Sequence, residues 1–142
     1  MEQTISFKQE RDLDAALTDP ATRTLNADKL TGRWLNTDPK TPGVAEITIS
    51  QDGNDFIVSV IGAGAEEPIE WPRTKATVLA NLEEEAGQRA LALAVDFDFD
   101  FMKSETYLRV NKGVLVIVLF NTFSDDSGRS NYLNREFFYH QS

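Results

Sequence analysis

The sequence contains no cysteine and only one histidine, His140. Disulfide bonds, thiolate metal sites and cysteine nucleophiles are therefore excluded, and so is any metal site built from several histidines. Basic residues are also scarce, since 14 lysines and arginines stand against 23 aspartates and glutamates, which gives a net charge of −9. Nucleic acids and anionic membrane surfaces are bound by clustered positive charge, so neither is an expected partner.

Long apolar runs are missing as well. The longest run, Val114–Phe120, is far shorter than the roughly 20 residues that cross a bilayer. The first residues are acidic and polar, whereas a secretory signal begins with basic and then apolar residues. We therefore expect a cytoplasmic protein. A chain of 142 residues that is 41% hydrophobic fits one packed domain.

The first 29 residues differ from the rest of the chain. Leu13, Ala16 and Leu17 lie at helical spacing within an otherwise polar stretch, and Asp19-Pro20 ends this pattern. The pattern predicts one short helix in a leader over residues 1–29. The alternative is a frayed, partly disordered leader, because two helical turns alone are only marginally stable.

From residue 30 to residue 142 hydrophobicity alternates with a period of two, which predicts a single β-domain. The predicted strands are Gly32–Thr37, Val44–Gln51, Phe56–Ile61, Thr74–Leu82, Arg89–Phe101, Lys103–Val110, Val114–Phe123 and Asn131–His140. No helical pattern separates them, so a parallel sheet is disfavoured. Closing eight antiparallel strands removes unpaired edges. We predict an all-β, eight-stranded antiparallel up-and-down barrel with a short N-terminal helix; a β-sandwich is the alternative.

Two strands indicate which side chains face the core. On the longest strand, one face carries Leu91, Leu93, Val95, Phe97, Phe99 and Phe101, and the other carries Asp96, Asp98 and Asp100. Burying unpaired carboxylates costs several kcal/mol each, so the leucine and phenylalanine face should point inward. The strand Val114–Phe123 begins with a run that is apolar on both faces. Its outward face needs a cover, either the N-terminal helix or a second subunit in a homodimer.

The first predicted strand begins with Gly32-Arg33-Trp34. This Gly-x-Trp pattern resembles the opening of the calycin superfamily, which includes the lipocalins and their bacterial lipocalin-like relatives. The resemblance implies that Gly32 and Trp34 pack under Arg135 from the last strand and close one end of the barrel, with the guanidinium over the indole. It also implies that the barrel binds a small molecule.

The same opening is similar to avidin-type barrels and to haem-binding barrels of the nitrobindin kind. The avidin-type barrels continue with a short polar loop that binds biotin, whereas this chain continues with Asp38-Pro39-Lys40-Thr41-Pro42. The haem-binding barrels need a proximal histidine, and the one candidate, His140, stands at the C-terminus.

The expected ligand-binding residues follow from the inward faces and the loops. We expect a largely apolar pocket with Val95, Phe97 and Phe99 on one wall and Tyr107, Trp71 and Arg129 nearer the mouth. Arg129 belongs to a polar loop, Ser124–Ser130, that would orient the polar group of a ligand. The alternative is an ordinary Asx-type turn with a surface arginine.

The sequence contains no recognisable catalytic constellation. His140 has no serine or cysteine partner at a motif position. The stripe of three aspartates lacks the turn that a calcium loop requires, so we expect no metal and no cofactor. The interpretation is a non-enzymatic protein that binds a small apolar molecule inside a lipocalin-like barrel. The alternatives are an interaction or structural module with a filled barrel and, more remotely, an enzyme of unknown reaction.

Overall fold

The computed structural model describes residues 25–26, 28–80 and 88–142. These residues form ten strands: β1 (Leu25–Asn26), β2 (Gly32–Asn36), β3 (Val44–Asp52), β4 (Asp55–Gly62), β5 (Ile69–Glu70), β6 (Thr74–Ala80), β7 (Gln88–Asp98), β8 (Met102–Asn111), β9 (Val114–Phe123) and β10 (Tyr132–Gln141). No helix in this part of the chain could cross a membrane. The helix predicted near residues 10–17 lies outside the described residues.

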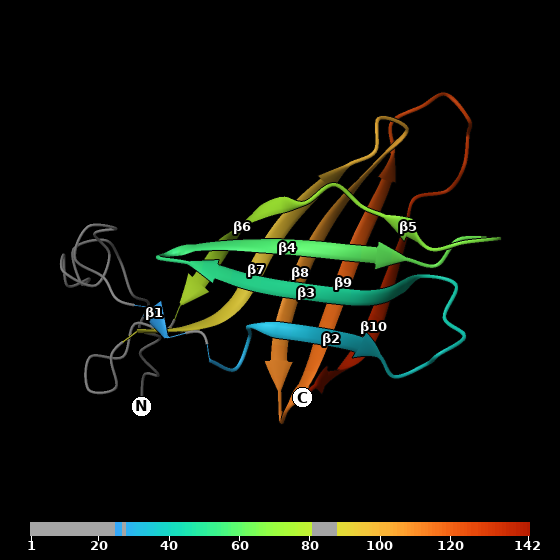
Figure 1. Cartoon of the computed structure of the whole chain (residues 1–142). Coiled ribbons are helices and arrows are strands. Elements are labelled where there is room, and N and C mark those ends of the chain that lie inside the picture. The colour runs from blue at the N-terminus through green and yellow to red at the C-terminus, as the bar shows by residue number, and fades with distance from the viewer. Residues whose placement is uncertain (1–24, 27, 81–87) are drawn as a thin grey trace, which may run out of the picture.

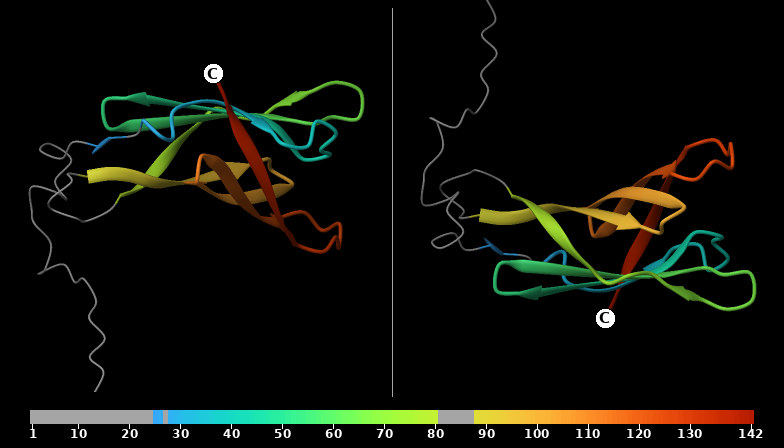
Figure 2. Two further views of the ribbon diagram at one scale, coloured as in Figure 1. Left: turned by 90° about the horizontal axis from the view of Figure 1, so that it is seen from below. Right: turned by 90° about the horizontal axis from the view of Figure 1, so that it is seen from above.

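Eight of the strands form a closed antiparallel barrel in chain order, from β2 through β3, β4, β6, β7, β8 and β9 to β10, which pairs back to β2. The predicted fold class is confirmed. Strands β2–β4 make one side of the flattened barrel and cross the strands β7–β10 of the other side at a steep angle (Figure 1, Figure 2). The added strands are β1, parallel to β7, and β5, which extends along β4. Each has two residues, too few for a periodic signal in the sequence.

Two tight hairpins fix the register of the strands that they connect. Gly53 joins β3 to β4 with a φ of 62°. Lys112 and Gly113 join β8 to β9 with φ values of 52° and 79°, the type I′ geometry that matches the right-handed twist of the strands. Both turns lie in the short gaps between strands that the sequence predicts, 52–55 and 111–113.

The core fills the space between the two sides of the barrel. Its largest fully buried side chains are Trp34, Phe56, Phe97, Phe138, Leu30, Ile47, Ile49, Leu93, Leu108, Leu115, Ile117 and Leu119. On β9 the inward set is Leu115, Ile117 and Leu119, and the valines between them point outward. The long β7 strand buries Leu93, Val95 and Phe97, as its alternation predicted.

The prediction was wrong at both ends of that long strand. Leu91 is 50% exposed and Phe101 is 46% exposed. At Leu91 the pairing with β6 shifts by one residue, so that Ala90 takes the inward place. Phe101 lies beyond the end of β7, after Asp100, whose φ of 69° turns the chain toward β8. A one-residue shift reverses the face of every later side chain.

The indole of Trp34 fills the end of the barrel that the C-terminus approaches, and it is 2% exposed. Its Nε1 donates to the Leu30 carbonyl at 2.9 Å, and its ring meets the His140 ring edge-on with centroids 4.9 Å apart. A Cβ on Gly32 would stand 2.3 Å from His140 Nε2, and the φ of Gly32 is 125°. Glycine is therefore required beside the imidazole. The burial of the tryptophan agrees with the calycin-type expectation.

The expected stacking of Arg135 on Trp34 is wrong. Trp34 pairs in register with His140, whereas Arg135 pairs with Val118 of β9. Inward residues of β10 have even numbers, as the buried Phe138 shows. Arg135 therefore projects from the outer surface, where its guanidinium lies 5.4 Å from the centre of the Phe137 ring.

Candidate binding face

The structure brings four of the six expected pocket residues together at the loop end of the barrel or on the wall below it. Trp71 packs edge-on against Phe97 and Phe99, with ring centroids 5.1 and 5.0 Å apart. Val95 follows on the same face of β7 and is buried. Trp71 is held by its backbone N–H, which donates to the Val60 carbonyl at 2.9 Å. These aromatic rings pack on one another as a cluster.

Below this aromatic cluster the barrel is filled by its own side chains. Val95 is 3% exposed and Phe97 1% exposed, and Leu93 and Leu119 are equally inaccessible. A ligand-sized cavity against these residues would leave part of their surface open. Eight-stranded barrels hold either packed side chains or one small ligand, and here the side chains occupy the space beside these residues.

Tyr107 is not part of this cluster. It is 43% exposed and projects from the outer face of β8, where its ring meets Phe120 edge-on at 6.0 Å. The inward residues of β8 are Ser104, Thr106 and Leu108. Glu105 and Arg109, two residues before and two residues after Tyr107, lie on the same face of the strand. This alternation of charged residues in the sequence is the signal that could have placed the tyrosine outside.

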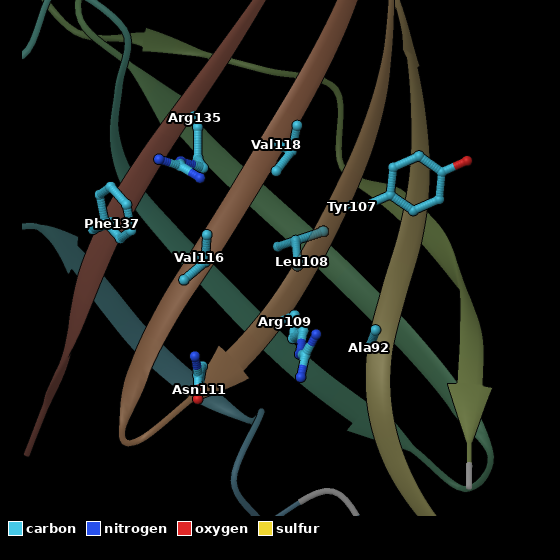
Figure 3. Close-up of a pocket in the computed structure, with 9 residues that line it drawn as sticks. All are labelled: Ala92, Tyr107, Leu108, Arg109, Asn111, Val116, Val118, Arg135 and Phe137. Atoms are coloured by element: carbon cyan, nitrogen blue, oxygen red, sulfur yellow. The ribbon is translucent and has the colours of Figure 1, made fainter.

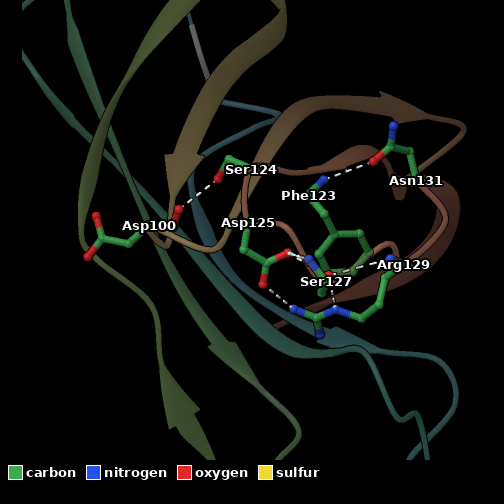
Figure 4. Close-up of polar contacts among 7 residues, drawn as sticks. All are labelled: Asp100, Phe123, Ser124, Asp125, Ser127, Arg129 and Asn131. Atoms are coloured by element: carbon green, nitrogen blue, oxygen red, sulfur yellow. Dashed lines mark hydrogen bonds and ion pairs between the residues drawn. The ribbon is translucent and has the colours of Figure 1, made fainter.

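Arg129 is held by its own loop (Figure 4). Its Nη2 donates to Asp125 Oδ2 at 2.8 Å and its Nε donates to Ser127 Oγ at 3.0 Å. The guanidinium also lies 4.1 Å from the centre of the Phe123 ring, a cation–π contact. The Ser127 hydroxyl, and after it the Arg129 guanidinium, lower the pKa of Asp125. The Ser127 N–H also donates to Asp125 Oδ1 at 3.2 Å, so the loop is the Asx-type turn of the alternative interpretation.

A polar network inside the barrel wall was not predicted. The carboxylate of Glu136 accepts hydrogen bonds from Thr41 Oγ1 at 2.7 Å, Asn36 Nδ2 at 3.1 Å and Asn134 Nδ2 at 3.0 Å. The backbone N–H of Val44 donates to both carboxylate oxygens at 3.1–3.2 Å. Four donors on one carboxylate tie the last strand to the loop between β2 and β3. The role of Glu136 is therefore to hold the barrel together at this end.

The outer surface of strands β7–β10 carries many exposed side chains among the described residues. Cross-strand pairing aligns its side chains in rows. One row is Ala92, Arg109, Val116 and Phe137; the next is Ala94, Tyr107, Val118 and Arg135; the third is Asp96, Glu105, Phe120 and Leu133. Leu133 is 56% exposed and Phe137 41% exposed. Apolar side chains therefore dominate the centre of this surface without a covering layer among the described residues.

A hollow of about 440 Å³ lies in the first two rows. Figure 3 shows its valine floor, with Tyr107 and Phe137 on opposite sides and the two guanidinium groups of Arg109 and Arg135 beside them. We call this surface the outer hollow; its lining residues are Ala92, Tyr107, Leu108, Arg109, Asn111, Val116, Val118, Arg135 and Phe137. Two cations beside an apolar floor suit an apolar group that carries carboxylates.

Within the described ranges, no three metal-binding side chains gather in one place. The aspartate stripe is consistent with a solvated face, since Asp96 and Asp98 are exposed. Asp98 Oδ1 accepts the Asp100 N–H at 2.9 Å as part of the turn toward β8.

Comparisons of the chain with models of protein families, with curated proteins and with solved structures find no match. The structure itself shows a closed, eight-stranded antiparallel barrel with two added short strands, β1 and β5.

Proposed function

We propose that this protein is a non-enzymatic interaction module whose outer hollow receives an apolar protein segment bearing carboxylates. The observation that carries the proposal is the partly exposed apolar floor at Val116 and Val118, with Arg109 and Arg135 beside it. Apolar surface gains free energy on leaving water. Arginine pairs with carboxylates through two parallel hydrogen bonds.

The size of the face favours a short segment over a folded partner. Four strands spaced about 4.8 Å apart give a width of about 14 Å, and rows from Tyr139 to Leu133 extend about 20 Å along β10. This area is well below the roughly 800 Å² per partner of a stable protein–protein interface. The width of about 14 Å accommodates one helix, which is about 10 Å in diameter.

The membership in the calycin superfamily is part of the proposal. Gly32 and Trp34 support it, because the indole is buried and the backbone at position 32 leaves no room for a side chain. Arg135 does not support it, since it stands on the outer surface. In this proposal the calycin-like barrel is the rigid scaffold that carries the outer hollow.

A second candidate is the binding of a small apolar molecule at the loop end of the barrel. The aromatic cluster of Trp71, Phe97 and Phe99 favours it, because Trp71 and Phe99 are only partly buried. Such a ligand would sit above the filled interior and would contact these two rings.

Titration with the neutral dye Nile red separates the two candidates. We expect Val118→Glu to weaken dye binding at least tenfold, because the charge enters the floor of the outer hollow. Thr48→Glu, on the exposed face of β3, is the matched control and should leave binding unchanged. Dye binding that depends on Phe99→Ala and not on Val118→Glu would favour the second candidate and contradict the first.

A further inference from the structure

We propose that the chain carries its own occupant for the outer hollow, the acidic segment of residues 10–17, which an external partner must displace. This inference rests on the proposed function and names the regulation of the same surface. The segment reads Glu-Arg-Asp-Leu-Asp-Ala-Ala-Leu and lies outside the described residues.

The segment is long enough and close enough to reach the hollow. β1 pairs at Leu25–Asn26 with Gln88–Arg89 of β7. Ala92, which lines the hollow, is four residues beyond Gln88 along β7, about 13 Å from the point where the chain enters β1. The seven residues between Leu17 and Leu25 span up to about 26 Å when extended. The chain entering β1 can therefore place Leu17 over the hollow with length to spare.

The chemistry of the segment complements that of the hollow. In the helix that the sequence predicts, Leu13 and Leu17 are one turn apart, and Glu10 and Asp14 lie on the same side. Two leucines flanked by two carboxylates match a valine floor with two guanidinium groups beside it (Figure 3). Residues 10–17 hold three acidic and one basic residue, so the attraction persists without an exact pairing.

The dimensions agree too. Eight helical residues are about 12 Å long, which fits within the roughly 20 Å that the rows extend along β10. A tethered segment also has an effective concentration in the millimolar range. It would therefore occupy the hollow even with weak intrinsic affinity and would set a threshold that an external segment must exceed.

Photo-crosslinking in the purified full chain tests the location of the segment. The photoreactive residue p-benzoylphenylalanine replaces Phe137, a conservative change at an exposed ring beside the hollow. The same residue at position 57, in place of Ile57 on the outward side of β4, is the control. We expect crosslinked peptides from residues 1–24 in a product of monomer mass. A product of dimer mass, or no crosslink above the control, would overturn the inference.

Dye binding then separates this inference from the proposed function. The double variant Leu13→Asp/Leu17→Asp should raise Nile red binding severalfold over the parent, and adding Val118→Glu should abolish the increase. If dye binding depends on Val118 but not on the two leucines, the hollow binds apolar groups and the tethered segment is not its occupant. If it depends on Val118 in neither background, both proposals fail. Near-ultraviolet circular dichroism checks that each variant keeps the barrel.

A charge swap gives a second, independent variant set. Arg109→Glu/Arg135→Glu should release the segment and raise binding of the neutral dye. Combining it with Glu10→Arg/Asp14→Arg should return binding toward the parent value. A combined variant that binds as much dye as the arginine variant would contradict the role of charge in holding the segment.

Discussion

The imidazole of His140 stands edge-on against the indole of Trp34 and joins the last strand of the barrel to the first. The two residues are direct cross-strand partners, Trp34 buried and His140 exposed at the end of β10. The closure of this end therefore depends on an aromatic pair and on the glycine beside it. The arginine that the calycin resemblance implied stands on the opposite surface of the strand.

Trp34→Ala should lower the free energy of unfolding by about 3–5 kcal/mol, because it removes a fully buried indole and leaves a cavity. His140→Ala should cost less, and the pair should show a coupling of about 0.5–1.5 kcal/mol in a double-mutant cycle. Arg135→Ala is the control: it should change stability by less than about 0.5 kcal/mol and add independently to Trp34→Ala. Urea denaturation measures all of these. Coupling between Trp34 and Arg135 instead would restore the original closure model.

Gly32→Ala should destabilise the barrel by about 1–3 kcal/mol, because its φ of 125° is unfavourable for alanine. The added methyl would also collide with His140 Nε2. Combining it with His140→Ala should recover the stability that is lost through the collision. The stability that is lost through the unfavourable φ should not be recovered. Thermal unfolding of the two single variants and the double variant makes the comparison. Equal losses in both backgrounds would show that the imidazole does not restrict this position.

Glu136→Gln should lower stability by about 1–3 kcal/mol, because the amide group would face hydrogen-bond donors that now meet a carboxylate oxygen. Glu46→Gln is the control, since Glu46 forms its ion pair with an exposed arginine, Arg33, and such pairs contribute about 1 kcal/mol or less. Gly43→Ala gives an independent check. Its Cβ would stand 2.7 Å from the Glu136 oxygens, so its cost should shrink in a Glu136→Ala background.

Asp125→Asn should have an effect that depends on pH. The lowered pKa of Asp125 means that its charged form stabilises the folded loop. That stabilisation is complete above the ordinary aspartate pKa of about 4 and is lost as the pH falls through the lowered folded value. The variant should therefore be slightly less stable than the parent at pH 7, and the difference should shrink as the pH falls below about 4. A difference that grows on acidification would contradict the assignment. Asp126→Asn, in the same exposed loop, is the matched control.

Much of the barrel follows from local patterns. The span of β9 equals its predicted range, and the inward and outward residues at the centre of β7 and along β9 follow from alternation alone. Alternation places side chains on two faces of one strand, and a wrong choice would bury Asp96 or Asp98. The penalty for burying a carboxylate is large enough to select the face without knowledge of the neighbouring strands.

The binding site was less accessible to the sequence. Tyr107 was expected near the mouth of the pocket, and the calycin resemblance placed Arg135 over Trp34. Their positions in β8 and β10 put both on the outer surface. The buried Ser104 and Thr106 share a hydroxyl–hydroxyl contact of 3.1 Å, which lets polar residues occupy inward positions. Residue type alone would have placed Ser104 and Thr106 on the outer surface.

The sequence by itself determined the number of barrel strands, their hairpin order and the orientation of the strongly patterned ones, because these depend on a period of two and on turn residues. Only the tertiary structure decided that His140 meets Trp34, that Glu136 binds the loop before β3, and that Arg109 and Arg135 lie beside one hollow. Each of these depends on the register between strands far apart in the chain. That register is set when the whole barrel closes, so no local pattern contains it.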